Sequence, residues 1–180
     1  MPQVSDEAIQ ALVDKQAIAE MLMRYCRSMD RQDRELAESV YWPDATDDHI
    51  LYCGDVPGFL AHAFRFMVDV RTVHFVGNIL IDFQSSFSAY SETYYIAYHD
   101  MPGENGRQDM TLWGRYLDRV EKRGNEWRIK ARTLTLDAFT IASGTAVWDK
   151  GMFAGIRTRG GAKPNDPLYR LDPGERHEHL

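Results

Sequence analysis

The stretch VPGFLAHAFRFMVDVRTVHFVGNILIDFQ, residues 56–84, holds the change of pattern that decides the fold. Up to about Val70 its apolar residues recur at three- and four-residue steps, as in an amphipathic helix, and Pro57 suits the first turn of such a helix. From Val73 onward, β-branched and aromatic residues follow one another as they do in strands. The chain is therefore expected to change from helix to strand within this stretch.

Two further helices are predicted before residue 56. Ser5 can cap a helix that runs to about Arg31, because the apolar residues between them follow helical spacing. Those apolar residues are Ile18, Met21, Leu22, Tyr25 and Met29. A short second helix over residues 33–41 must end where Pro43 bars its continuation. Residues 44–46 are then expected to form a turn into extended chain.

Four long strands are predicted after the change of pattern. They cover residues 73–84, 87–99, 109–121 and 126–140. Turn-forming residues at 101–108 and 123–125 predict hairpins between them. Helices followed by a strand meander indicate an α+β fold, a cone in which three N-terminal helices pack in a strongly curved antiparallel sheet.

The chain is expected to hold one domain and a tail. A length of 180 residues suits a single domain, which the patterns place at residues 1–140. Residues 141–180 are rich in glycine and proline, with scattered apolar anchors, and are expected to be an extended C-terminal tail. Such a tail is a lid over a pocket, an arm that contacts another subunit, or a loosely packed terminus.

Composition excludes several classes of function. A net charge of -6 and a pI near 5.5 leave no basic surface for nucleic acid. No segment is apolar enough to span a membrane and no signal peptide is visible, so a cytoplasmic location is expected. Cys26 and Cys53 lack the spacing of a metal or redox motif and are read as reduced thiols.

Asp30 and His74 are the two residues that could carry chemistry. Asp30 lies on the apolar face of the first helix, so it either caps a following turn or meets a donor across the core. A lone histidine among apolar residues, as His74 is, is usually structural. An imidazole held by a carboxylate through one nitrogen can instead act as a general base through the other. Spacing alone does not show that two residues 44 positions apart meet.

A resemblance to a known family implies that Asp30 and His74 do meet. It covers residues 6–137 and is carried by YCRSMDRQD (25–33), YWPDA (41–45), TVHFVGN (72–78), GRY (114–116) and WRI (127–129). These segments resemble the SnoaL-like branch of the nuclear transport factor 2-like superfamily, and the chain is similar to scytalone dehydratase and hexachlorocyclohexane dehydrochlorinase. The resemblance implies that Asp30 orients His74, which abstracts a proton from the substrate.

The resemblance also implies a third catalytic residue, Arg132, which would stabilise the charge of the leaving group. Strand alternation argues against this role. Arg128, Lys130 and Arg132 share one face of their strand, so without a β-bulge Arg132 points to solvent with the other two cations.

Four residues are expected to bind the substrate: Tyr25, Asn78, Tyr41 and Phe64. Tyr25 resembles a pocket tyrosine of the bile-acid dehydratases, although a tyrosine on a helix face is often part of the core. Those dehydratases use an acidic strand residue that is missing here, with Ala97 near its place. Residues 47–49, Asp-Asp-His, are read as a solvated turn and not as a metal site, because adjacent residues in extended chain point to opposite faces.

The function expected from the resemblance is a cofactor-independent lyase or isomerase, of the dehydratase or dehydrohalogenase type. Its substrate would be a small cyclic or aromatic molecule, and neither a cofactor nor a metal is expected. The alternatives are a polyketide cyclase-like enzyme and a non-catalytic binding or scaffold subunit, such as the β subunit of a ring-hydroxylating dioxygenase. A homodimer or homotrimer is expected from the same resemblance.

Overall fold

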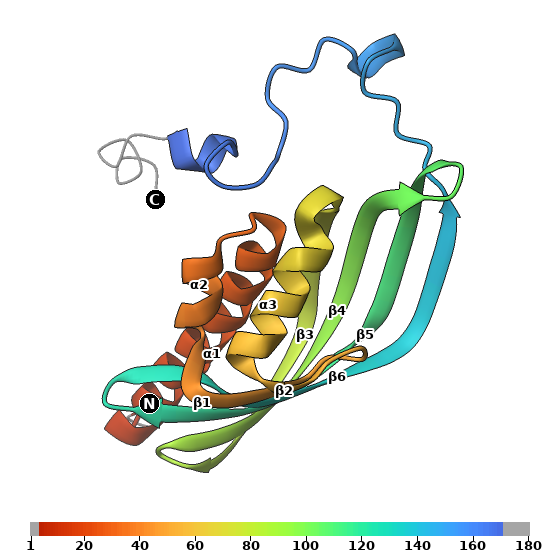
Figure 1. The fold of residues 1–180 in the computed structure, drawn as a ribbon. Helices are drawn as coiled ribbons and strands as arrows, with labels where there is room; N and C mark the ends of the chain where they lie inside the picture. The colour runs from red at the N-terminus through yellow and green to blue at the C-terminus, as the bar shows by residue number, and fades with distance from the viewer. Residues whose placement is uncertain (1–3, 171–180) are drawn as a thin grey trace.

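A curved sheet of six strands packs against three helices (Figure 1). The computed structural model describes residues 4–170. The helices are α1 (Asp6–Asp30), α2 (Arg34–Ser39) and α3 (Val56–Phe66), and a short 3-10 turn, Met67–Asp69, follows α3. The strands are β1 (Tyr41–Asp48), β2 (Cys53–Asp55), β3 (Arg71–Ser85), β4 (Ser88–Gly103), β5 (Gly106–Arg123) and β6 (Glu126–Ser143). The predicted α+β cone is confirmed.

The strand order is β2-β1-β6-β5-β4-β3, and all neighbours are antiparallel except β1 and β6. The parallel pair comes from residues 41–48, part of which was expected to be helix and turn. That expectation is wrong in detail. The second helix ends at Ser39, and the extended chain around Pro43 adds to the sheet through Tyr41 opposite Ile129 and Thr46 opposite Ala131.

The helix ends follow local sequence signals. The Ser5 hydroxyl accepts a hydrogen bond from the Ala8 amide at 3.2 Å and caps α1, as predicted. Asp33 caps α2 in the same way, and Asp55 caps α3, where Pro57 lies in the first turn. These caps fix where each helix begins and so set the direction in which it enters the core.

The core lies between α1 and the inner face of the sheet. From α1 it takes Ile18, Met21, Leu22, Tyr25, Cys26 and Met29, all of which are buried. Their spacing of three and four residues places them on one stripe of the helix. Buried residues of the sheet, such as Val120 and Ile129, meet this stripe, so the apolar periodicity of the sequence accounts for the packing.

The chain after β6 returns to the helices. Figure 1 shows it arching over the end of the sheet and reaching the corner between α1 and α2. There the Lys163 amide donates to the Arg31 carbonyl at 2.7 Å, and Lys163 Nζ and the Tyr169 hydroxyl both bind Asp33, at 3.1 and 2.9 Å. Two 3-10 turns, Gly151–Phe153 and Pro167–Arg170, are its regular structure. Whether this tail acts as a lid or an arm stays a prediction.

Of the helices in residues 4–170, none combines the length and apolarity that crossing a bilayer requires.

Candidate functional site

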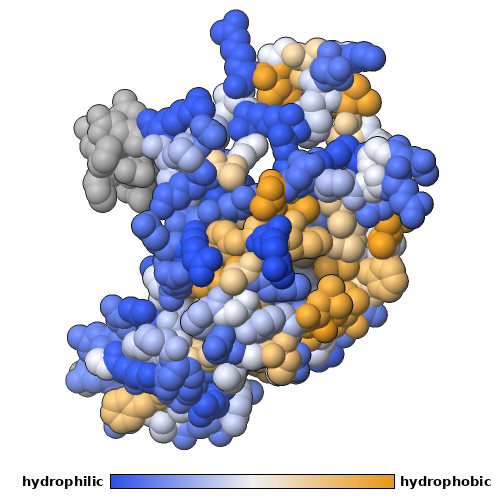
Figure 2. Space-filling view, viewed as in Figure 1, coloured by the Kyte–Doolittle hydropathy of each residue, from blue (hydrophilic) through white to orange (hydrophobic). Residues whose placement is uncertain are grey.

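A cavity of about 330 Å³ opens between the helices and the sheet. Its walls come from α1, α3, the loop between β1 and β2, and strands β3 to β6. The aromatic part of the lining is Tyr25, Phe59, Phe66, Tyr95, Tyr116 and Phe139. Figure 2 shows hydrophobic residues gathered between the helices and the sheet, while the helical side is largely hydrophilic. A concave, mainly apolar hollow of this size suits a small organic ligand.

Asp30 and His74 meet at the wall of this cavity. The Asp30 Oδ1 atom lies 2.6 Å from His74 Nδ1, and each side chain is 10% exposed. The same carboxylate accepts hydrogen bonds from the His74 amide at 2.9 Å and from the Thr72 hydroxyl at 2.9 Å. Asp30 therefore has several donors, which meets the requirement that a largely buried charge be hydrogen-bonded.

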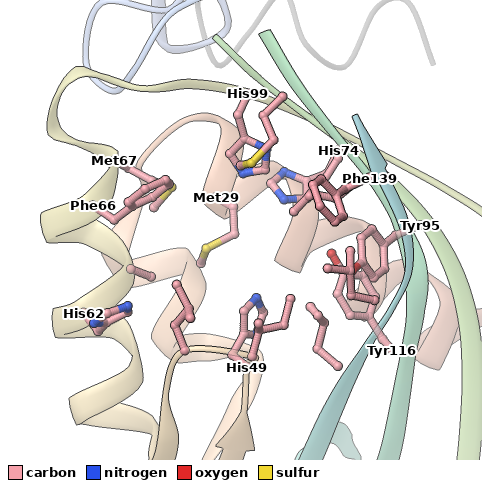
Figure 3. Close-up of a pocket in the computed structure, with 18 of the residues that line it drawn as sticks. Met29, His49, His62, Phe66, Met67, His74, Tyr95, His99, Tyr116 and Phe139 are labelled. Atoms are coloured by element: carbon pink, nitrogen blue, oxygen red, sulfur yellow. The ribbon is translucent and has the colours of Figure 1, made fainter. Parts of the chain in front are cut away.

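Chain geometry explains the meeting. Asp30 is the last residue of α1, and Thr72 and His74 are alternate residues of β3, so both point inward. Because Nδ1 of His74 faces Asp30, Nε2 is the ring nitrogen left for a ligand. Figure 3 shows the His74 ring at the cavity. An imidazole held in this way can accept a proton through Nε2, while the carboxylate stabilises the charge that forms.

His99, which the sequence analysis missed, lies beside His74. Their rings meet edge to face with centroids 5.9 Å apart, and His99 also lines the cavity (Figure 3). Burial, followed by the nearby His74, lowers the pKa of His99 to about 4. Its Nδ1 atom has no hydrogen-bond partner within the described chain. The available signal was strand alternation, since Tyr95, Ala97 and His99 are alternate residues of β4.

The interpretation of residues 47–49 as a solvated turn is wrong. The Asp47 side chain is fully buried, and its two oxygens meet the Tyr41 hydroxyl at 2.7 Å and His49 Nδ1 at 3.1 Å. His49 follows β1 and lines the cavity. Adjacent residues of extended chain point to opposite faces, but residues 47 and 49 lie two apart and share a face.

Arg132 is fully buried, contrary to simple strand alternation. Arg119 pairs with Ala131 whereas Val120 pairs with Ile129, so Lys130 is an extra residue in β6. This β-bulge reverses the alternation and turns Arg132 inward.

The buried guanidinium of Arg132 forms a bidentate pair with Asp118, with N–O distances of 2.7 and 2.8 Å. It is stacked between the rings of Tyr25 and Tyr116, at 4.1 and 4.2 Å from their centroids. The two tyrosines line the cavity and Arg132 does not. Its expected role at a leaving group stays a prediction, and in this structure the guanidinium is held behind the cavity wall.

Of the four residues expected to bind substrate, only Tyr25 lines the cavity. Tyr41 is buried behind it, with its hydroxyl on Asp47. Asn78 is exposed where a register shift between Val76 and Ile79 interrupts β3. Phe64 lies on a side of α3 away from the cavity, with the Arg34 guanidinium 5.9 Å from its ring centroid. None of these three side chains lines the cavity.

No three histidine, cysteine or carboxylate side chains in residues 4–170 are grouped as a metal site would need. Ala97, expected near the place of a missing acidic residue, lines the cavity. The polar groups that reach the cavity are therefore chiefly histidines and tyrosines.

Comparison with known proteins gives the family. A SnoaL-like domain matches residues 10–133. No curated protein matches the chain in sequence.

Several solved structures share the fold. A protein of Novosphingobium aromaticivorans, provisionally named as a scytalone dehydratase, is 25% identical, with a TM-score of 0.66 over 76% of this chain and 93% of that one. A hexachlorocyclohexane dehydrochlorinase from Novosphingobium barchaimii is 16% identical, with a TM-score of 0.68 over 77% of this chain and 97% of that one. The match to the dehydrochlorinase shows a common fold alone. The chain belongs to the SnoaL-like domain family, within the nuclear transport factor 2-like superfamily.

Proposed function

We propose that the chain is a lyase or isomerase that removes a proton from a carbon next to an activating group, with His74 as the general base. The observation that carries the proposal is the 2.6 Å contact of Asp30 with His74 Nδ1 at an apolar cavity. Asp30 orients the ring and stabilises the imidazolium. The reaction needs no cofactor, because a side chain takes the proton and the activating group of the substrate accepts the electrons.

The cavity favours a small cyclic or aromatic substrate. Tyr95 and Tyr116 stack with ring centroids 4.6 Å apart and planes 20° apart, and they offer a flat wall. Burial raises the pKa of Tyr25 far above its usual range, so its phenol stays neutral and can only donate or accept a hydrogen bond. Apolar walls keep water from competing with the imidazole for the proton.

The fold hosts many functions, so it does not choose among them. Two of the similar structures have the names of eliminating enzymes: one is provisionally named as a scytalone dehydratase, and the other is named as a dehydrochlorinase. These names agree with the proposal. A polyketide cyclase-like reaction is the alternative enzyme class. A purely structural subunit has no need of a carboxylate–imidazole pair facing an apolar hollow.

The test is proton exchange. A panel of cyclic and aryl ketones is incubated with the protein in heavy water, and loss of the α-proton signals is followed by NMR. We expect the native chain to accelerate exchange for at least one ketone and His74→Gln to lower that rate by about 100-fold or more. No acceleration with any ketone, or full activity in His74→Gln, would overturn the assignment.

We also propose that the chain forms a homodimer or homotrimer through the outer face of the sheet. Val73, Phe75, Tyr94 and Ile96 are exposed there on the adjacent strands β3 and β4. An apolar patch of this kind on a soluble surface commonly marks an interface. Sedimentation velocity measures the assembly, and a monomer at all concentrations would contradict it.

A further inference from the structure

The cavity holds a second carboxylate–histidine pair that the proposed base does not use. His49 Nδ1 lies 3.1 Å from Asp47 Oδ1, and the other Asp47 oxygen accepts the Tyr41 hydroxyl at 2.7 Å. The Asp47 side chain is fully buried, and these two neighbours give its carboxyl group the hydrogen-bonding partners that a buried polar group needs. The arrangement repeats that of Asp30 and His74 on another part of the cavity wall.

The ring of His49 is held in a defined orientation. It packs against Phe59 with centroids 4.5 Å apart and planes at 31°. Since Nδ1 faces Asp47, Nε2 is the nitrogen available to a ligand. Figure 3 shows His49 on one side of the cavity, with His74 and His99 on the other. A ligand in the cavity would therefore lie between His49 and His74.

Solvent contact differs between the two pairs. The His49 side chain is 25% exposed, compared with 10% for His74. His49 follows β1 at the turn that carries the exposed residues Ile50 and Leu51, so water can reach it and replace a proton after each turnover. His99 is less suited to donate a proton, since its pKa of about 4 keeps it neutral near pH 7.

We propose that His49, oriented by Asp47, is the general acid that protonates a leaving oxygen, and that the substrate is therefore a β-hydroxy carbonyl compound and not a halide. The inference rests on the proposed function and deepens it. His74 Nε2 takes the α-proton, and the electrons of the C–H bond form the C=C bond. The C–O bond breaks and its electron pair stays on oxygen. His49 enters the step as the imidazolium, with Nδ1–H facing Asp47, and its Nε2 proton converts the leaving oxygen into water.

The balance of the step explains the choice of leaving group. Substrate gives the unsaturated carbonyl compound and water, His74 gains one proton and His49 loses one, and solvent restores both. Hydroxide is a poor leaving group and needs this proton. Chloride leaves as the anion and does not, so of these two leaving groups only the hydroxyl needs a proton from a second paired histidine.

Two matched probes separate the roles. They are β-hydroxycyclohexanone, which loses water, and β-chlorocyclohexanone, which loses hydrogen chloride. Both give the same cyclohexenone, and its ultraviolet absorption measures the rate of each reaction. We expect His49→Gln to lower kcat/KM by about 100-fold for the hydroxy ketone and by less than about threefold for the chloro ketone. The glutamine side chain keeps hydrogen-bonding capacity but cannot transfer a proton.

The matched control is His62→Gln. His62 also lines the cavity, and among residues 4–170 no carboxylate pairs with it. Its substitution should leave the ratio of the two kcat/KM values as in the native chain. The chloro ketone also reports whether the His49→Gln site remains folded.

The outcomes distinguish this inference from the proposed function. An equal fall for both ketones in His49→Gln, or no fall for either, overturns the role of His49. Ketone α-proton exchange that persists in that variant and is lost in His74→Gln leaves the general base in place. If the native chain accelerates neither exchange nor elimination, the proposed function itself is overturned.

Discussion

The imidazole of His99 meets the imidazole of His74 edge to face, with ring centroids 5.9 Å apart. Both line one cavity, yet their surroundings differ. His74 has the Asp30 carboxylate on Nδ1, whereas Nδ1 of His99 has no partner in the described part of the chain. Burial and the nearby His74 therefore oppose protonation of His99, whose Nδ1 has no carboxylate beside it, so the surroundings of two otherwise similar side chains differ in kind.

The first prediction concerns the titration of His99. Burial and then the nearby His74 hold its pKa at about 4, so we expect its ring signals in a histidine-selective NMR titration to shift near pH 4. A midpoint near 6.5, the ordinary value for histidine, would show that the ring is solvated.

The free energy of unfolding should depend on pH because of the same lowered pKa of His99. Between about pH 6.5 and pH 4 the unfolded chain binds a proton at His99 that the folded chain does not. The free energy of unfolding therefore decreases as the pH falls through this range. From pH 7 to pH 5 the loss is about 2 kcal/mol. Urea unfolding of the native chain and of His99→Leu at both pH values tests it. Parallel changes in the two proteins would contradict the expectation.

The second prediction is that Asp30→Asn lowers activity and stability together. The amide is similar in shape, but it cannot accept from all the donors that face Asp30, including Thr72 Oγ1 and the His74 amide. We expect a loss of about 1–3 kcal/mol in the free energy of unfolding. Ketone exchange should fall because the imidazolium loses its counter-charge. Unchanged exchange would show that His74 does not depend on Asp30.

The third prediction concerns the buried pair of Arg132 and Asp118, whose side chains are both 0% exposed. Arg132→Met leaves the Asp118 carboxylate buried without its partner, which costs about 3–5 kcal/mol. Replacing both, as Arg132→Met with Asp118→Leu, should recover most of that loss. Denaturant unfolding of the two single variants and the double variant gives the coupling energy.

The exposed pair of Arg123 and Asp44 is the control for this cycle. Arg123→Met should change stability little, because solvent already screens that pair. If the double variant at 132 and 118 is as unstable as the single variants, shape rather than charge governs this part of the core.

Much of the fold follows from periodicity, and one residue shows where periodicity fails. The spacing from Ile18 to Met29 predicts a buried stripe, and the structure buries it, because long apolar patterns constrain a helix strongly. Arg132 is different. Its direction depends on the single extra residue Lys130, and no local signal distinguishes a bulge there from a regular strand.

The site was predictable in part. Asp30 and His74 each stood out, but their contact needed a family resemblance, because the sequence does not give the packing of α1 on β3. The pair of Asp47 and His49 could have been found from its spacing of two residues, which places side chains on one face of extended chain. Its burial could not, since that depends on the unexpected parallel pairing of β1 with β6.

The last prediction concerns two glycines in the sheet. A Cβ at Gly114 would lie 2.0 Å from the Thr135 carbonyl oxygen and 2.7 Å from the Tyr95 hydroxyl, whereas a Cβ at Gly77 would have no atom within 4 Å. The Thr135 carbonyl is backbone in the adjacent strand β6, so it can retreat only by distorting the sheet beside the stacked Tyr95 and Tyr116. We expect Gly114→Ala to cost about 1–3 kcal/mol, as overpacking does, and Gly77→Ala to cost little. Thermal unfolding of both variants measures the difference, and equal melting temperatures would mean that β6 shifts freely at this register change.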